Sequence, residues 1–215
     1  MLGKLMVMLQ IIVRGLESLK NLRRGANESG RQSGGLLRLL FLSRLSSPQL
    51  RNLSDSLSSS SSSSESGLEV NNKYNIIKTA LAEFGITEKP GIEDNSPRIL
   101  EYFKEIGQTW VKTDETAWCS AFVNFIAKVT GHEYTGKLNA RSWLDVGEDT
   151  DKPEVGDIVV LWREDPDSWK GHVGFFIKTL GNYVWILGGN QGNKVQISRY
   201  PLSRLLSYRV LRFKS

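Results

Sequence analysis

The chain of 215 residues contains a single cysteine and only two histidines. One thiol cannot form an intramolecular disulfide, and two imidazoles supply no cluster with zinc-ligand spacing. These scarcities exclude a disulfide scaffold and a structural zinc site, and we expect neither a metal nor a cofactor. What remains is a lone thiol, Cys119, and a distant imidazole, which are either chemically idle or a nucleophile and its base.

Long hydrophobic runs are also absent. The most apolar stretch, residues 5–13, is too short to cross a bilayer, which needs roughly 20 residues. Apolar residues of the first 19 positions recur every three or four residues, which predicts a helix with one apolar face. Residues 36–45 form a second apolar stretch that arginines interrupt, which is typical of a segment that lies at a membrane interface. We therefore expect residues 1–45 either to attach to a membrane surface, a virion or a partner helix, or to form a disordered leader.

Excess positive charge is confined to the N-terminal segment. Residues 1–65 hold nine Lys or Arg and four Asp or Glu, whereas residues 66–215 hold equal numbers of each. The globular part therefore has no net charge that would favour nucleic acid, and we expect no specific nucleic-acid partner. The leader could still meet an anionic surface.

Seven consecutive serines, at positions 58–64, mark a domain boundary. A polyserine run has no apolar surface to bury and no periodicity, so it predicts a flexible tether. The expected organisation is a basic amphipathic leader over residues 1–57, a linker over residues 58–67 and a catalytic domain over residues 68–215.

The pattern of apolar residues changes along that domain. Helical spacing predicts helices that end at Gly85, Gly107 and Gly131, with a further short helix near residues 141–146. From residue 157 onward, short β-rich runs alternate with turn residues; they cover residues 157–162, 172–178, 183–187, 194–198 and 208–213. Helices followed by strands predict an α+β fold, with N-terminal helices packed on a five- to six-stranded antiparallel sheet.

Cys119 stands at the expected start of the third helix. In the first turn of a helix, unpaired backbone N–H groups and the positive end of the dipole favour a thiolate, and the same groups can hold an oxyanion. A free cysteine is, however, more often a small buried hydrophobe. The context of the thiol must decide between these interpretations.

His172 is the better candidate for the base. It opens a strand between two glycines, and a rigidly held imidazole is what a Cys/His pair requires. His132 lies past the other end of the Cys119 helix, about 18 Å from its start. An amide in the turn after the next strand would orient the imidazole; Asn190 is the first choice and Gln191 the second.

Four segments in order carry a resemblance to a known family: Trp-Cys-Ser-Ala-Phe at 118–122, Pro-Glu-Val-Gly-Asp at 153–157, Gly-His-Val-Gly-Phe at 171–175 and Gly-Gly-Asn-Gln-Gly-Asn at 188–193. They resemble the NlpC and CHAP group of papain-like cysteine peptidoglycan hydrolases, over about residues 72–212. The resemblance implies a papain-like fold and cleavage of cell-wall amide bonds by an endopeptidase or amidase, through an acyl-enzyme on Cys119.

Further expectations follow from this resemblance and from the leader. Loop side chains would bind the substrate, and the candidates are Trp118, Arg141, Ser142 and Trp169. A leader on a serine tether suits a phage lytic or virion-associated endolysin that acts on the wall, attached to a membrane or carried in a virion. Two alternatives stay open: an effector-type cysteine peptidase that acts on protein, and a catalytically silent structural or wall-binding module.

Overall fold

A computed structural model of the protein describes residues 65–91 and 94–214, with side chains described from residue 73 onward. All of these residues lie in one compact unit, residues 63–215. The predicted leader and the serine run fall outside the described residues. Within the described part, no helix is long and apolar enough to cross a membrane.

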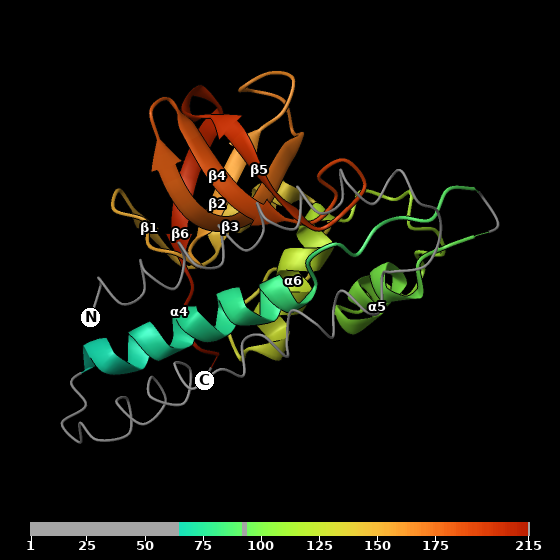
Figure 1. Cartoon of the computed structure of the whole chain (residues 1–215), viewed down its shortest axis with the longest axis horizontal. Helices are drawn as coiled ribbons and strands as arrows, with labels where there is room; N and C mark the ends of the chain where they lie inside the picture. The colour runs from blue at the N-terminus through green and yellow to red at the C-terminus, as the bar shows by residue number, and fades with distance from the viewer. Residues whose placement is uncertain (1–64, 92–93, 215) are drawn as a thin grey trace, which may run out of the picture. The chain divides into compact units, whose positions relative to one another are not determined.

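Three helices precede the sheet, as predicted. They are α4 (Glu65–Ala82), α5 (Pro97–Glu105) and α6 (Cys119–Val129), followed by the 3-10 helix η1 (Ala140–Asp145). Helix α4 begins three residues before the expected start of the domain, so residues 65–67 are helical. In Figure 1 these helices lie together on one side of the sheet.

Six strands form one sheet in the order β1-β6-β2-β3-β4-β5, and the neighbours are antiparallel. Their bounds are β1 (Glu148–Thr150), β2 (Ile158–Trp162), β3 (Gly171–Leu180), β4 (Tyr183–Gly188), β5 (Gln196–Pro201) and β6 (Leu205–Val210), with the short 3-10 helix η2 (Leu202–Arg204) between the last two. This architecture confirms the predicted α+β class and antiparallel sheet.

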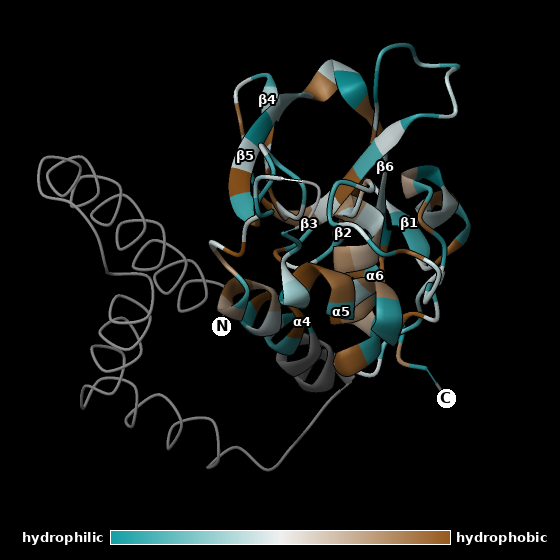
Figure 2. Cartoon of the chain, turned by 90° about the vertical axis from the view of Figure 1, so that its right-hand side faces the viewer, coloured by the Kyte–Doolittle hydropathy of each residue, from teal (hydrophilic) through white to brown (hydrophobic). Residues whose placement is uncertain are grey.

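Helix α6 forms the centre of the core. Nine of its eleven residues are buried, which is typical of a helix covered on all sides. The Phe122 ring meets the Phe175 ring of β3 edge to face, with centroids 6.1 Å apart. Figure 2 shows the hydrophobic colouring of α5 and α6 where they lie next to the sheet. The N-terminus of α6 is therefore held at a fixed place against β3.

Local sequence signals set the helix ends. Ser96 precedes Pro97 at the start of α5, where the missing N–H of proline costs nothing. Gly107 and Gly131 follow α5 and α6 with φ of 82° and 77°, a region that favours glycine. These positions agree with the predicted ends of both helices.

Candidate active site

Cys119 is the first residue of α6, and its neighbours fix this end of the helix. The Trp118 side chain is fully buried, and its indole N–H donates to Glu88 Oε1 at 2.7 Å. On the other side of the thiol, Ser120 Oγ donates to the carbonyl of Lys137 at 2.7 Å. Trp143 of η1 donates to the same hydroxyl at 3.0 Å. The backbone around Cys119 is thus tied to three separate segments.

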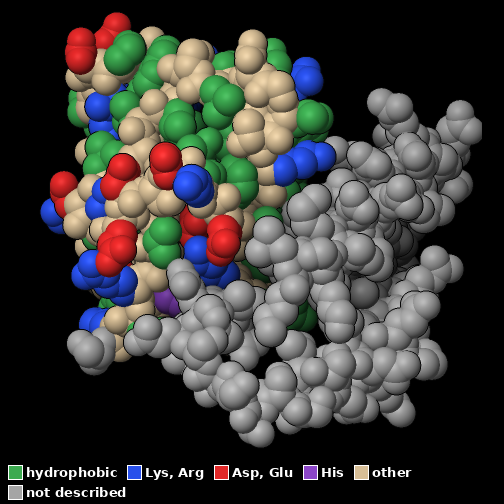
Figure 3. Space-filling view, turned by 90° about the vertical axis from the view of Figure 1, so that its left-hand side faces the viewer, with side chains coloured by type: hydrophobic (Ala, Val, Ile, Leu, Met, Phe, Trp, Pro, Cys, Tyr) green, Lys and Arg blue, Asp and Glu red, His purple; other side chains and the backbone are tan. Residues whose placement is uncertain are grey.

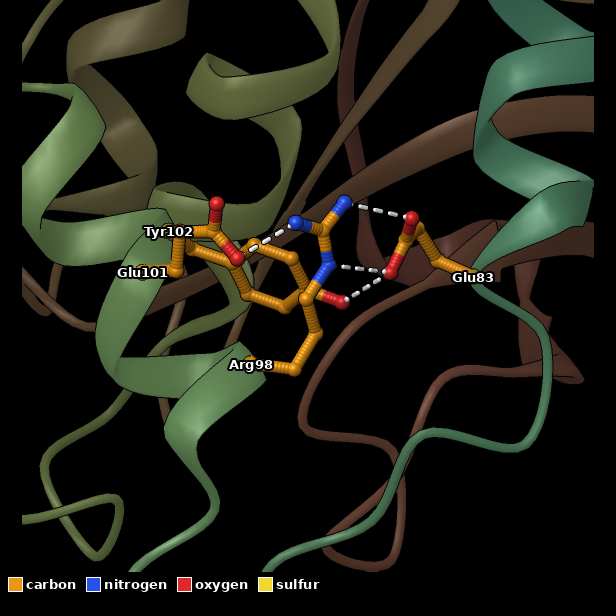
Figure 4. Close-up of polar contacts among 4 residues, drawn as sticks. All are labelled: Glu83, Arg98, Glu101 and Tyr102. Carbon is orange, nitrogen blue, oxygen red and sulfur yellow. Dashed lines mark hydrogen bonds and ion pairs between the residues drawn. The ribbon is translucent and has the colours of Figure 1, made fainter.

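A polar cluster joins Glu83, which follows α4, to Arg98, Glu101 and Tyr102 of α5 (Figure 4). The buried carboxylate of Glu83 accepts from Arg98 Nη2 at 2.6 Å and from the Tyr102 hydroxyl at 2.9 Å. Burial and the Glu83 charge raise the pKa of Tyr102 well above its usual range. The centre of the Tyr102 ring lies 6.1 Å from that of the Trp118 ring, so the cluster packs near the residue that precedes Cys119.

His172 is the second residue of β3, in a part of the strand that is open on one side. The ladder between β3 and β4 begins only at Phe175, whereas β2 pairs with β3 from Gly171 onward. The next residue, Val173, offers its backbone N–H to the Cys119 sulfur. The Cys119 sulfur therefore lies against the residue that follows His172 in β3.

The environment of the Cys119 thiol has opposing effects on its charge. Burial is the largest effect and raises the pKa of the thiol. Backbone N–H groups of Val173, Ser120 and Cys119 itself, and the charge of Arg163, act in the other direction. The sequence led us to expect that the helix start would favour a thiolate, and that effect is present. Burial outweighs this effect, so the pKa of the Cys119 thiol is raised overall and the free thiol is protonated at neutral pH.

The amide of Gln191 is the group that contacts the imidazole. Gln191 Oε1 lies 3.4 Å from His172 Nε2, and both side chains are buried. Gln191 Nε2 donates to the carbonyls of Gly188, at 3.0 Å, and Gln196. Because the amide nitrogen is engaged by two carbonyls, the oxygen must face the ring, where it accepts from Nε2–H. The imidazole is then left with an unprotonated Nδ1.

Asn190, the other candidate for this role, lies at the turn itself. Its φ is +52°, in the left-handed region that asparagine tolerates better than most residues. The structure thus brings Gln191 rather than Asn190 to the imidazole.

Burial also keeps His172 neutral. It lowers the pKa of the imidazole to about 4, with the charge of Arg163 acting in the same direction and the Gln191 contact opposing it. At neutral pH the free site therefore contains a protonated thiol and a neutral imidazole whose Nδ1 can accept a proton.

Two further side chains reach this site, and the sequence reasoning missed both. The Tyr200 ring of β5 lies 5.2 Å from the His172 ring, tilted by 36°. Burial, with the Cys119 charge acting in the same direction, raises the pKa of Tyr200 to about 12. The Arg163 charge acts on Cys119, His172 and Tyr200 alike. The β-rich pattern would have included Tyr200 if the predicted run over residues 194–198 had been extended to Pro201, where β5 ends.

The four residues expected to bind substrate have different surroundings. Trp118 is enclosed in the core and has no surface to offer a substrate, so this expectation is wrong for its side chain. Trp169 is 70% exposed in the loop between β2 and β3. Arg141 of η1 holds this loop through the carbonyls of Lys170 (3.3 Å) and Pro166 (2.5 Å). Ser142 donates to the carbonyl of Asn139 at 2.7 Å and stabilises the turn into η1.

The second histidine has a structural place. His132 follows the far end of α6, stacks on Phe213 with centroids 4.6 Å apart and contacts Thr130 Oγ1 through Nδ1 at 2.9 Å. In the part of the chain that the structure describes, no three or more His, Cys, Asp or Glu side chains gather in a way that could hold a metal ion.

Comparison with known proteins gives one family match. Residues 111–190 match the family model of the CHAP domain. No curated protein matches the chain. Two solved structures resemble it only distantly. The P60 domain of an antigen from M. avium subspecies paratuberculosis has 11% identity and a TM-score of 0.42, over 66% of this chain and 95% of that one. A lipoprotein-like NLP/P60 protein from Staphylococcus aureus has 17% identity and a TM-score of 0.39, over 65% of this chain and 41% of that one.

The matched segment begins before α6 and ends in the turn after β4, so it contains both Cys119 and His172. It also contains three of the four motifs in full and the first half of the Gly-Gly-Asn-Gln-Gly-Asn turn. Residues 111–190 are therefore similar to the CHAP domain, one of the families that the four motifs resemble.

Proposed function

We propose that the protein hydrolyses amide bonds of peptidoglycan peptides, as an endopeptidase or amidase, with Cys119 as nucleophile and His172 as base. The observation that carries this proposal is the orientation of His172. Its Nε2 faces Gln191 Oε1 at 3.4 Å, and it stands one residue before the N–H that approaches the Cys119 sulfur. A base held by a third group beside a nucleophile is the arrangement that acyl transfer through cysteine requires.

The proposed reaction begins from the neutral pair. His172 Nδ1 accepts the proton of the Cys119 thiol as the sulfur attacks the carbonyl carbon of the amide. The C–N bond then breaks, and the imidazolium returns its proton to the leaving amine. Water attacks the thioester with His172 again as base, which releases the carboxylate and restores the thiol.

Backbone N–H groups around the sulfur support the stabilisation of the tetrahedral intermediate. The N–H groups of Cys119 and Ser120 belong to the first turn of α6, where helical N–H groups have no intrahelical partner. Donors placed at a developing oxyanion are typically worth several kcal/mol, about 3 for each donor. We assign the oxyanion to this helix start.

Arg163 favours an anionic part of the substrate beside the reacting bond. It is exposed, and in the described part of the chain it takes part in none of the salt bridges. A guanidinium near the nucleophile is well suited to a free carboxylate of a wall peptide. Trp169, on the loop that Arg141 holds, lies in the same β2–β3 connection and is the aromatic residue that we propose contacts the substrate.

The direct test is digestion of purified peptidoglycan by the full chain, with mass spectrometry of the soluble fragments. We expect new amine and carboxyl ends at one type of amide bond. Cys119→Ala should abolish the release, and undiminished release would remove Cys119 from the mechanism. Cleavage of a protein substrate in the absence of wall cleavage would instead favour an effector-type peptidase. No cleavage of either substrate would favour a silent module.

The two histidines provide a matched control. His172→Gln should lower kcat by about 100-fold or more, because general base catalysis contributes 10²–10⁴-fold. His132→Gln replaces an imidazole that packs on Phe213 at the opposite end of α6, so it should leave kcat within about twofold. Equal losses in both variants would contradict the assignment of His172.

The leader has a separate role in the proposal. We propose that residues 1–57 attach the enzyme to a membrane surface or to a virion, as expected for a phage lytic protein. What supports this is the basic, apolar composition of that segment and the serine run that follows it. Co-flotation of a peptide of residues 1–57 with anionic liposomes tests attachment to a membrane surface. If the peptide does not float, a protein partner is favoured.

A further inference from the structure

The C-terminal part of the chain has an unusual charge distribution. Residues 168–215 contain eight Lys or Arg and no Asp or Glu. This segment includes strands β3 to β6, so the acidic residues of the domain all precede the second half of the sheet. In Figure 3, acidic side chains at the left and below lie among basic ones, whereas the upper right of the described surface displays hydrophobic and basic side chains.

Two of these basic residues flank aromatic rings on one face of the sheet. The strand register places Lys178 of β3 opposite Trp185 of β4, and Trp185 opposite Arg199 of β5. The adjoining row runs from Leu180 through Tyr183 to Pro201. We call Lys178, Tyr183, Trp185 and Arg199 the aromatic–basic face.

Contacts within the aromatic–basic face are between cations and rings. Lys178 Nζ lies 5.2 Å from the centre of the Trp185 ring, and Arg199 Cζ lies 5.1 Å from the centre of the Tyr183 ring. In the described part of the chain, neither cation takes part in a salt bridge. Tyr183 is 39% exposed and Leu180 beside it is 63% exposed. The face therefore presents uncompensated positive charge and accessible aromatic surface together.

We propose that the aromatic–basic face is a second peptidoglycan-binding site, which holds the polymer while the site at Cys119 cleaves it. This inference rests on the proposed function. The rings provide flat apolar surface for sugar rings, and the two cations meet the carboxylates of the peptide stems. Both kinds of group occur together on a glycan that carries acidic peptides.

Charge decides against two other occupants. The leader, residues 1–57, carries nine Lys or Arg and three Asp or Glu, so its positive charge would be repelled by Lys178 and Arg199. A second copy of the same face would bring like charges together in the same way. An anionic polymer is the occupant that the charges favour.

The position of the face suits a polymer that also reaches the catalytic site. Trp185 lies on β4 three residues before Gly188, whose carbonyl accepts from the Gln191 amide. The same short strand thus joins the aromatic–basic face to the residue that orients His172. A polymer bound along β4 would therefore lie on the strand whose end leads into the turn that carries Gln191.

Binding can be measured without cleavage. The full chain carrying Cys119→Ala would be sedimented with purified peptidoglycan that has been stripped of other anionic polymers by mild acid. We expect Trp185→Ala and the double change Lys178→Gln with Arg199→Gln each to raise the dissociation constant about tenfold. Binding should also weaken as the salt concentration rises, because exposed charges are screened.

Exposed positions elsewhere supply the controls. Trp110→Ala and Lys112→Gln alter an exposed tryptophan, 66% exposed, and an exposed lysine between α5 and α6. They should leave binding unchanged, and melting temperatures should be similar for all variants. Unchanged binding in the face variants would overturn the proposal, as would binding only to wall that retains its other anionic polymers. All proteins in this binding assay carry Cys119→Ala, so binding is measured without cleavage. A failure of the proposed function would appear instead in the digestion of peptidoglycan by the parent chain.

Discussion

The Oε1 atom of Gln191 lies 3.4 Å from Nε2 of His172, and the amide that carries it is fixed by two backbone carbonyls. Gln191 comes from the turn between β4 and β5, whereas His172 lies near the start of β3. The tautomer of the proposed base is thus set by a turn 19 residues further along the chain.

Replacing Gln191 by leucine should misorient the imidazole without removing it. We expect kcat to fall between about ten- and a hundredfold with KM little changed, because orientation of the base supports part of a 10²–10⁴-fold contribution. Steady-state kinetics on soluble wall peptides measure both constants. Asn190→Gly is the matched control, since glycine accepts the positive φ at that turn. A larger loss in Asn190→Gly than in Gln191→Leu would transfer the role to Asn190.

Acid should destabilise the protein through His172. The pKa of this imidazole is about 4 in the folded chain and 6.5 ordinarily, so the unfolded chain binds the proton first as the pH falls. The stability from the buried neutral ring is present above pH 6.5 and is lost as the pH falls towards 4. The loss is about 3 kcal/mol in free energy of unfolding, at about 1.4 kcal/mol for each pKa unit.

Urea unfolding at pH 7 and at pH 4.5 measures this change. His172→Gln should show a smaller drop between the two pH values than the parent protein. The pKa of His132 is also lowered by burial, but His132 is present in the parent protein and in His172→Gln. Its contribution to the change in stability therefore cancels when the two proteins are compared. An identical drop in both proteins would show that His172 does not titrate in this way.

Tyr200 should act through its ring rather than its hydroxyl. The ring packs 5.2 Å from the imidazole and also joins a small core with Val184 and Ile186 on that side of the sheet. We therefore expect Tyr200→Phe to keep kcat within about threefold and Tyr200→Ala to lower it about tenfold or more.

Alkylation by iodoacetamide gives a second measurement that needs no substrate. The chain has one cysteine, so the reaction reports on Cys119 alone. The dependence of its rate on pH should be preserved in Tyr200→Phe and altered in Tyr200→Ala. If Tyr200→Phe loses as much activity as Tyr200→Ala, activity depends on the Tyr200 hydroxyl rather than on its ring.

Gly189 should tolerate no side chain. A Cβ atom there would lie 2.5 Å from Cζ3 of Trp118 and 2.8 Å from Cβ of Phe122, both in the core. Overpacking of this kind typically costs about 1–3 kcal/mol. We expect Gly189→Ala to lower the melting temperature and the activity together, because the turn carries Gln191. Gly188→Ala, where the closest atoms are 3.3 Å away, should be milder in a thermal scan.

Much of the fold could be predicted because its signals are local. Glycines with positive φ end α5 and α6 at the expected residues, and the alternation of strands from residue 157 onward gave the antiparallel sheet. Strand β1 was not predicted. It is a short acidic segment that pairs with β6, where Arg212 bonds Glu148 and Arg209 faces Asp149. Pairing over about 60 residues leaves no trace in a local pattern.

Residues of the candidate site could be predicted where they belong to a sequence motif. Cys119 and His172 come from such motifs, and the structure places the Cys119 sulfur against the backbone N–H of Val173, the residue after His172. The choice between Asn190 and Gln191 depends on which side chain the turn directs inward, and adjacent amides in a sequence do not reveal that. Arg163 and Tyr200 reach the site only through the packing of β5 and of the β2–β3 loop.

Burial of the Cys119 thiol has a consequence for chemical durability. Peroxide attacks the thiolate and not the thiol, and the oxidised sulfinic and sulfonic acids cannot perform acyl transfer. A cysteine that is only 6% exposed as a residue, with its thiol pKa raised by burial, spends little time in the vulnerable form. Under the proposed mechanism, the Cys119 sulfur would resist oxidants between turnovers, because it would become reactive only when His172 takes its proton during attack on a bound substrate.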